Sequence, residues 1–163
     1  MLLRALVLIT MTAFPAGAAE KVAFFGITFL DASHLGAIKG RDPAETARTA
    51  MLDQLVRDRF AREGYDLVAL DPVSGKLAGI ANPAQCNRCD TRMAVELGAD
   101  YSLVGEVHKV SNLILSMNLQ LREADTGTMV KGLAVDIRSN TDESWRRGMQ
   151  YILRYAFFGE GTE

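Results

Sequence analysis

The chain contains two cysteines, and they stand close together in the stretch AQCNRCDTRM, residues 84–93. Cys86 and Cys89 are separated by two residues and followed directly by Asp90. This spacing suits a thiol–disulfide couple, half of a metal site or a small structural disulfide. Covalent haem attachment needs a histidine where Asp90 stands, so the sequence excludes it.

The surroundings of the pair weaken the redox and metal alternatives. A thioredoxin-like couple opens a long helix, whose dipole lowers the thiol pKa, whereas this pair follows an irregular loop and precedes a short helix expected at about residues 90–97. Arg88 and Arg92 could still favour the thiolate. Zinc would need the two histidines, His34 and His108, as further ligands, and they lack the short spacing of a zinc motif.

The interpretation that fits best is a local disulfide, formed in an oxidising compartment. Closing a loop of about four residues stabilises a fold by only about 2 kcal/mol in the chain-entropy model, which orders a loop but does not build a core. We therefore expect no catalytic residue, no metal site and no cofactor. Thiol-redox or metal-handling work, as an accessory of exported oxidoreductases, is kept as the alternative.

The compartment follows from residues 1–19, MLLRALVLITMTAFPAGAA, which have the pattern of a secretory signal peptide. Arg4 precedes an apolar run, residues 5–14, and the small residues AGA at 16–18 suit cleavage. The run is about half of the roughly 20 residues needed to span a bilayer. No cysteine stands at the cleavage point for lipid attachment. We therefore expect a soluble periplasmic protein without stable membrane insertion.

The remaining segment, residues 20–163, has the size of a single globular domain. The whole chain has a formal net charge of −2 and no basic run, so nucleic acid is not an expected partner. The expected partners are other periplasmic proteins, which the sequence does not identify. It leaves the oligomeric state open as well.

Hydrophobic patterns predict alternating strands and helices in the first half of the domain. A buried strand is expected at residues 21–30 and another at residues 65–70. A long helix lies between them, with Asp42 as N-cap and Glu45 completing a capping box. A strand–helix–strand unit of this kind joins parallel strands through a right-handed crossover.

The second half is expected to form a strand at residues 100–110, a hairpin at 112–139 and a final helix at 141–158. In the hairpin, a turn at residues 125–127 pairs Met117 with Val135 and Leu119 with Leu133. The final helix points four large apolar side chains inward, namely Trp145, Met149, Ile152 and Phe157. The fold class is α/β (α+β), a single domain with a mixed sheet in the order β-α-β-α-β-β-β-α.

This topology gathers polar residues at one edge of the sheet. The carboxyl ends of parallel strands meet at one edge, where open α/β sheets bind ligands. The loops at 31–41, 71–90 and 108–112 and the start of the last helix are expected there. The candidate interaction edge comprises His34, Lys39, Cys86, Arg88, Cys89, His108, Asn112, Asn140, Asp142 and Glu143. The simpler interpretation of residues 140–143 is a helix start with acidic residues that favour its dipole.

Several motifs carry a resemblance. The strand KVAFFGITFL, the segment ELGADYSLVGEV and the turn READTGTMVKG resemble the amino-terminal domain of TolB and the related domain of CsgG. The ordered motifs C-x-x-C-D, LGAD, VSNLIL and NTDESWxRG are similar to a family of small exported bacterial proteins of unknown function. The resemblance implies a periplasmic domain that works through protein contacts, without a cofactor. We therefore expect a non-enzymatic interaction or accessory domain.

Overall fold

The structure is a computed structural model that describes residues 18–40 and 42–159. The expected signal peptide lies outside the described residues up to residue 17. The strands are β1 (Lys21–Asp31), β2 (Asp66–Leu67), β3 (Tyr101–Lys109), β4 (Leu115–Glu123) and β5 (Met129–Ile137). The helices are α1 (His34–Lys39), α2 (Pro43–Arg62), α3 (Ser74–Leu77), α4 (Cys89–Glu96) and α5 (Asp142–Ile152). Short 3₁₀ turns cover Asp71–Val73 and Pro83–Gln85, and a π-helical turn, Leu153–Phe157, extends α5.

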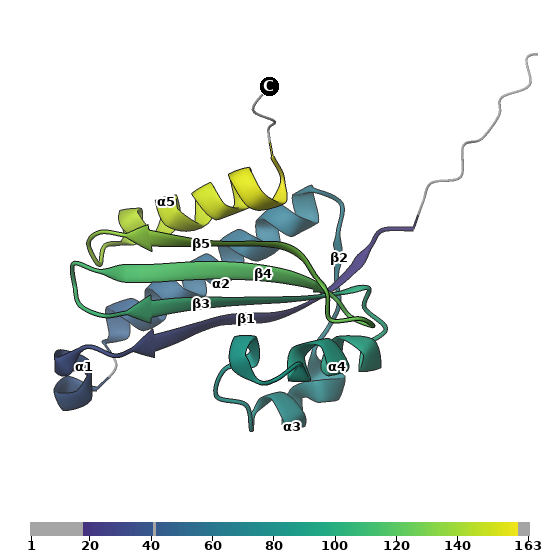
Figure 1. The fold of residues 1–163 in the computed structure, drawn as a ribbon, viewed down its shortest axis with the longest axis horizontal. Coiled ribbons are helices and arrows are strands. Elements are labelled where there is room, and N and C mark those ends of the chain that lie inside the picture. Colours follow the sequence, from purple (N-terminus) through teal and green to yellow (C-terminus); the bar gives the residue numbers. More distant parts are fainter. Residues whose placement is uncertain (1–17, 41, 160–163) are drawn as a thin grey trace, which may run out of the picture.

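The five strands form one mixed sheet in the order β2-β1-β3-β4-β5. β2, β1 and β3 are parallel, and β4 and β5 complete an antiparallel meander. The long helices α2 and α5 cover one face, while α3 and α4 cover part of the other (Figure 1). The predicted fold class and the parallel arrangement of the first three strands are confirmed.

The hairpin register is also confirmed. Met117 pairs with Val135 and Leu119 pairs with Leu133. Gly127 adopts a φ of +72° in the turn, a left-handed conformation that glycine reaches without strain. The four apolar side chains predicted to point inward from the last helix are all buried.

Three local predictions were wrong. β2 has two residues instead of six, because it pairs only with the first two residues of β1 before the chain turns into the 3₁₀ helix at Asp71. The expected loop after β1 contains α1, which Ser33 caps by accepting a hydrogen bond from the Gly36 N–H at 3.1 Å. The expected hairpin begins at Leu115 instead of residue 112, and Leu113 lies before β4 in an exposed turn, where Ser111 Oγ accepts hydrogen bonds from the backbone.

The main core lies between the sheet and the helices α2 and α5. It buries, among others, Phe24, Leu52, Phe60, Met117, Leu119, Trp145 and Met149. A smaller core lies on the other face, under α4. It includes Ala23, Phe25, Met93 and Val104. The structure is therefore layered, with its larger apolar layer on the α2 and α5 side.

A bulge in β1 shifts by one residue the positions that face the main core. Phe24 faces the main core, Phe25 the smaller one, and Ile27 the main core again. Between them Gly26 has a φ of +86°, which suits glycine. Asp53 of α2 accepts a hydrogen bond from the Ile27 N–H at 2.8 Å, so the long helix is fixed to the middle of the strand.

The core assignment predicts a large effect for Met117→Ala. This side chain is 1% exposed, so truncation should lower the free energy of unfolding by about 2–5 kcal/mol. Met129→Ala is the matched control, because Met129 is half exposed on the same sheet, and it should change stability by less than about 0.5 kcal/mol. Urea unfolding measures both, and similar losses would contradict the register.

Candidate functional site

The carboxyl ends of β1 and β3 meet several loops at one end of the sheet, seen at the left of Figure 1. We call this end the carboxyl edge: it comprises α1, the first turn of α2, the β3–β4 loop (residues 110–114) and the β5–α5 loop (residues 138–141). Backbone bonds join these segments, since Ala32 N–H donates to Lys109 O at 2.9 Å and Ser139 N–H to Leu113 O at 3.4 Å. The edge is thus one continuous structure.

A buried lysine lies at the centre of the carboxyl edge. Lys109, the last residue of β3, donates from Nζ to Glu45 Oε1 at 2.6 Å and to Asp31 Oδ2 at 3.3 Å. The side chains of Lys109 and Glu45 are 7% and 1% exposed. An ammonium removed from water to this extent requires close carboxylates, because an unpaired buried charge costs several kcal/mol.

Glu45 does not complete the predicted capping box, so that expectation was wrong. Asp42 caps α2 alone by accepting from the Ala44 N–H at 2.9 Å. The Glu45 carboxylate turns inward, where it accepts from Lys109 and from Asn140 Nδ2 at 2.6 Å. The reason is electrostatic: a buried ammonium needs this carboxylate more than an exposed N–H does.

Asn140 links this ion cluster to the helix that closes the main core. Its Oδ1 accepts from Trp145 Nε1 at 2.9 Å and from Arg48 Nη1 at 3.2 Å. Arg48 in turn donates from Nε to Asp142 Oδ1 at 2.7 Å. The buried indole therefore has its hydrogen-bond partner, and α2 and α5 are connected through polar side chains at this edge.

The ionised state of the cluster is favoured by its own contacts. Burial alone would raise the pKa of Asp31, but hydrogen bonds from Ser33 and Lys109 outweigh it and lower that pKa below its ordinary value. Burial alone would lower the pKa of Lys109, but hydrogen bonds to Glu45 and Asp31 and their charges raise it. Both groups therefore stay charged across the neutral range.

Close packing holds α1 against this cluster. Asp31 Oδ1 accepts from the Ser33 N–H at 2.8 Å. Gly36 lies directly against the same carboxylate, and a Cβ at this position would overlap it. The short helix α1 thus depends on Asp31 for its position.

The structure brings together only some of the residues predicted for the interaction edge. Asn112 and Asn140 lie at the carboxyl edge, Asp142 begins α5 directly beside it, and His34 begins α1 there with an exposed side chain. Lys39 ends α1, but its side chain lies outside the described residues.

The other predicted residues lie elsewhere. His108 belongs to the opposite face of β3 from Lys109, since successive residues of a strand alternate. Arg88 donates from Nη2 to Thr126 O at 2.6 Å, at the turn between β4 and β5, which is the far end of the sheet. The loop that contains Cys86 and Cys89 lies at the same far end.

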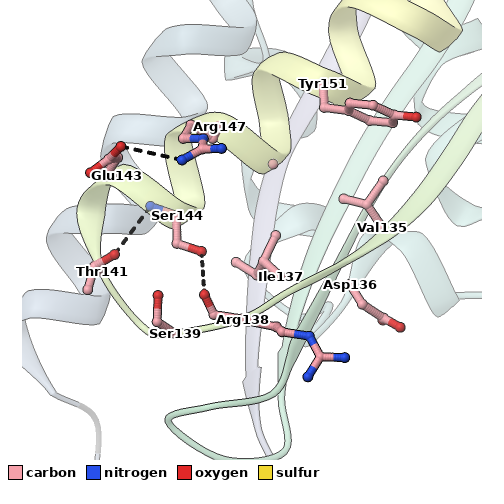
Figure 2. A pocket seen from close by; sticks show the side chains of 11 residues that line it. Val135, Asp136, Ile137, Arg138, Ser139, Thr141, Glu143, Ser144, Arg147 and Tyr151 are labelled. Carbon is pink, nitrogen blue, oxygen red and sulfur yellow. Dashed lines mark hydrogen bonds and ion pairs between the residues drawn. The ribbon is translucent and has the colours of Figure 1, made fainter.

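Glu143 faces a different hollow, the groove between β5 and α5 shown in Figure 2. This cavity measures about 700 Å³. Glu143 pairs with Arg147 at 3.6 Å, and both side chains are largely exposed. Ser144 Oγ donates to Arg138 O at 3.0 Å, and both residues line the groove. The groove thus has mixed walls, with exposed polar side chains beside Val135, Ile137 and Tyr151, and it contains none of the buried charged groups described above.

Sequence reasoning missed the central residues, Asp31, Glu45 and Lys109. One signal was present in the sequence. Lys109 lies an even number of positions after Leu103 and Val107, so all three side chains point to the same buried face of β3. A cation at such a position calls for a carboxylate from another element.

The two cysteines form a disulfide, as the favoured interpretation predicted. The two arginines beside it are held by carbonyl oxygens, Arg88 by Thr126 and Arg92 by Asn87. They are therefore engaged with the backbone instead of with a sulfur. Contacts around the disulfide are those of a structural loop.

A second polar network fixes that loop to the sheet. Glu106 on β3 accepts from Asn82 and Gln85 at 2.6 Å each, and from Asn118 at 3.0 Å. Asp90, directly after the disulfide, accepts from Ser102 Oγ at 2.7 Å and from Arg122 at 3.3 Å. Polar contacts thus add to the smaller apolar core in covering the face of β3 and β4 opposite the main core.

Within the described ranges, no group of three or more histidine, cysteine, aspartate or glutamate side chains is arranged to hold a metal ion. Among the same residues, none of the helices is both long and apolar enough to cross a membrane.

Comparison with known proteins identifies the family. The model of the family DUF3280, described as "Protein of unknown function (DUF2380)", matches residues 20–157, and the chain belongs to this family. The comparison with curated proteins gives no match.

Solved structures share the fold. The C-terminal domain of LpoB from Salmonella enterica has a TM-score of 0.52 at 18% identity, covering 78% of this chain and 88% of that chain. The same domain from Escherichia coli gives 0.51 at 16% identity, with 78% and 88% covered. A lipoprotein from Neisseria meningitidis gives 0.50 at 16% identity, with 75% and 82% covered. At such identities the likeness shows the fold alone.

Removing Glu45 should be costly. Glu45→Ala leaves Lys109 buried with one weaker partner, so the free energy of unfolding should fall by about 3–5 kcal/mol. Glu96→Ala removes the partner of Lys76 in an exposed ion pair, and this control should cost at most about 1 kcal/mol. Urea unfolding compares them, and equal losses would show that the buried pair is not a major contributor.

Asp31 should shape the pH dependence of stability. Because folding lowers its pKa, its contribution is present above the unfolded value of 3.8 and is lost as pH falls through the folded value. Asp31→Asn should therefore be less stable than wild type at neutral pH, and the difference should shrink in acid. Asp136→Asn, at an exposed position, is the control. A constant difference across melts from neutral to acid pH would contradict this assignment.

The disulfide should have a modest effect. Replacing Cys86 and Cys89 together by serine should lower the free energy of unfolding by at most about 2 kcal/mol, because the closed loop is short. The fold and the hairpin register should survive in a thermal melt and an NMR spectrum. Loss of the folded state would mean that the disulfide does more than order its loop.

Proposed function

We propose that the chain is an exported, non-enzymatic domain that binds another protein of the bacterial periplasm through its carboxyl edge. The proposal includes removal of residues 1–19 as a signal peptide, so that the purified protein begins at Ala19 or Glu20. Its main support is an exposed apolar surface on two neighbouring segments of this edge. The surface consists of Ile38, Val110, Leu113 and Ile114, which are 68%, 53%, 72% and 55% exposed.

The shape of this edge suits protein binding. Large apolar side chains on the surface of a soluble protein mark interaction sites when they gather in one place. Ile38 stands on α1, which Asp31 contacts through the Ser33 N–H, and the other three stand on the β3–β4 loop, where Leu113 O accepts from the Ser139 N–H. Segments ordered before binding lose less conformational entropy when they bind. An ordered, exposed apolar surface of this kind favours the binding of another protein.

The charge of the edge argues against an anionic membrane surface as the partner. Asp31 and Glu45 pair with the ammonium of Lys109, and Asp42 lines the same pocket, whereas anionic lipids attract clusters of basic residues. The alternative of thiol-redox or metal handling has no contact in its favour, since the arginines beside the disulfide bind carbonyl oxygens.

Site-specific photo-crosslinking in living cells tests the proposal. A photoreactive amino acid at position 113 or 38 should give a discrete cross-linked protein, which mass spectrometry then identifies. The matched control is position 95, since Val95 is also exposed but lies on α4, away from the carboxyl edge. Cross-links at position 95 alone, or none at positions 38 and 113, would contradict the proposal.

The identified partner allows a quantitative prediction. Leu113→Ser should weaken binding by about tenfold, as expected when one anchoring apolar side chain is lost. Its stability should change by less than about 0.5 kcal/mol because the side chain is exposed. Val95→Ser should leave both affinity and stability unchanged. Calorimetric titration with the purified partner measures the affinity, and equal affinities for the two variants would place binding elsewhere.

A further inference from the structure

A small cavity lies beside the buried lysine at the carboxyl edge. It has a volume of about 190 Å³. Its lining consists of Asp31, Gly36, Gly40, Asp42, Glu45, Lys109 and Asn112. A water molecule occupies about 30 Å³ of liquid, so the cavity has room for several waters or for the head of one long side chain.

Among the described residues that line the cavity, acidic groups are in excess. Asp31, Asp42 and Glu45 provide three carboxylates, whereas Lys109 provides one ammonium. The N-terminus of α2 adds about half a positive charge, which does not cancel the excess. A cation is therefore the favoured occupant.

One buried oxygen lacks a hydrogen bond. Glu45 Oε1 already accepts from Lys109 and Asn140, but Oε2 has no partner among the described residues. Glu45 is 1% exposed and lines the cavity, so this oxygen can be satisfied only by a donor that enters the cavity. A buried acceptor without a donor is unfavourable. It indicates a missing donor on the cavity side.

We propose that this cavity receives a basic side chain, lysine or arginine, from the protein partner. The inference rests on the proposed function and adds the chemistry that the partner must present. The aliphatic stem of such a side chain would lie on Ile38 and Leu113 while its charged head enters the cavity. A metal ion is a poorer match, because the ammonium of Lys109 already contacts two of the three carboxylates.

NMR titration of the isotope-labelled protein tests the cavity without knowledge of the partner. The probes are the acetyl-methylamide derivatives of arginine and lysine, with the glutamine derivative as neutral control and sodium chloride to match ionic strength. The amide signals of Gly36, Gly40 and Asn112 should shift saturably with the basic probes only. Equal shifts with the glutamine probe, or none with any probe, would overturn the inference.

Two variants that leave the buried pair intact sharpen the test. Asn112→Lys places an ammonium at the cavity and should abolish the saturable shifts, whereas Gln150→Lys adds the same charge on exposed α5 and should not. Asp42→Asn keeps an equally good N-cap and should weaken probe binding by about two- to fivefold. Unchanged binding in Asn112→Lys would overturn the inference.

Partner binding separates the two proposals. If Leu113→Ser weakens partner binding and Asn112→Lys does not, the proposed function stands and the inference is wrong. If both variants weaken it while Gln150→Lys does not, both are supported. If cross-linking finds no partner at positions 38 and 113, the proposed function fails, and the inference that rests on it fails too.

Discussion

The buried ammonium of Lys109 is the interaction on which this end of the molecule depends. A strand that ends in a lysine on its buried face can only fold if carboxylates meet the charge, because an unpaired buried ammonium costs several kcal/mol. Glu45 comes from the first turn of α2 and Asp31 from the end of β1, so one side chain determines how a helix and a strand meet. Asn140 extends the same constraint to α5. The loops that carry the exposed apolar surface are positioned as a consequence.

The other face of the sheet is held by different means. There Glu106 and Asp90 accept hydrogen bonds from amides, a hydroxyl and a guanidinium, and the Cys86–Cys89 disulfide closes the short loop that precedes Asp90. This layer covers the sheet but leaves the carboxyl edge uncovered. The two polar networks therefore stabilise different parts of the structure, one at the carboxyl edge and one on the face opposite the main core.

Much of the architecture could be predicted because it depends on local pattern. Alternating apolar residues in β4 and β5 specify their pairing, since a shift of one residue would expose the whole set. The site was harder to predict because it depends on pairs far apart in the chain. The local spacing of Asp42 and Glu45 predicts a capping box. Glu45 turns inward because it pairs with Lys109, which is distant in the sequence. Family membership agrees with the motifs that pointed to a family of unknown function. The resemblance to TolB and CsgG stays a prediction.

Hydrogen exchange in a Lys109→Met variant tests the central claim most directly. Methionine keeps the stem of the side chain but removes the charge that Glu45 and Asp31 surround. The amides of Ala32, Gly40 and Ser139 report on the carboxyl edge, and those of Ala124 and Gly127 report on the opposite end. The account predicts that exchange accelerates selectively at the carboxyl edge, beyond any change at the opposite end. Equal acceleration at both ends, or unchanged protection at the edge, would contradict it.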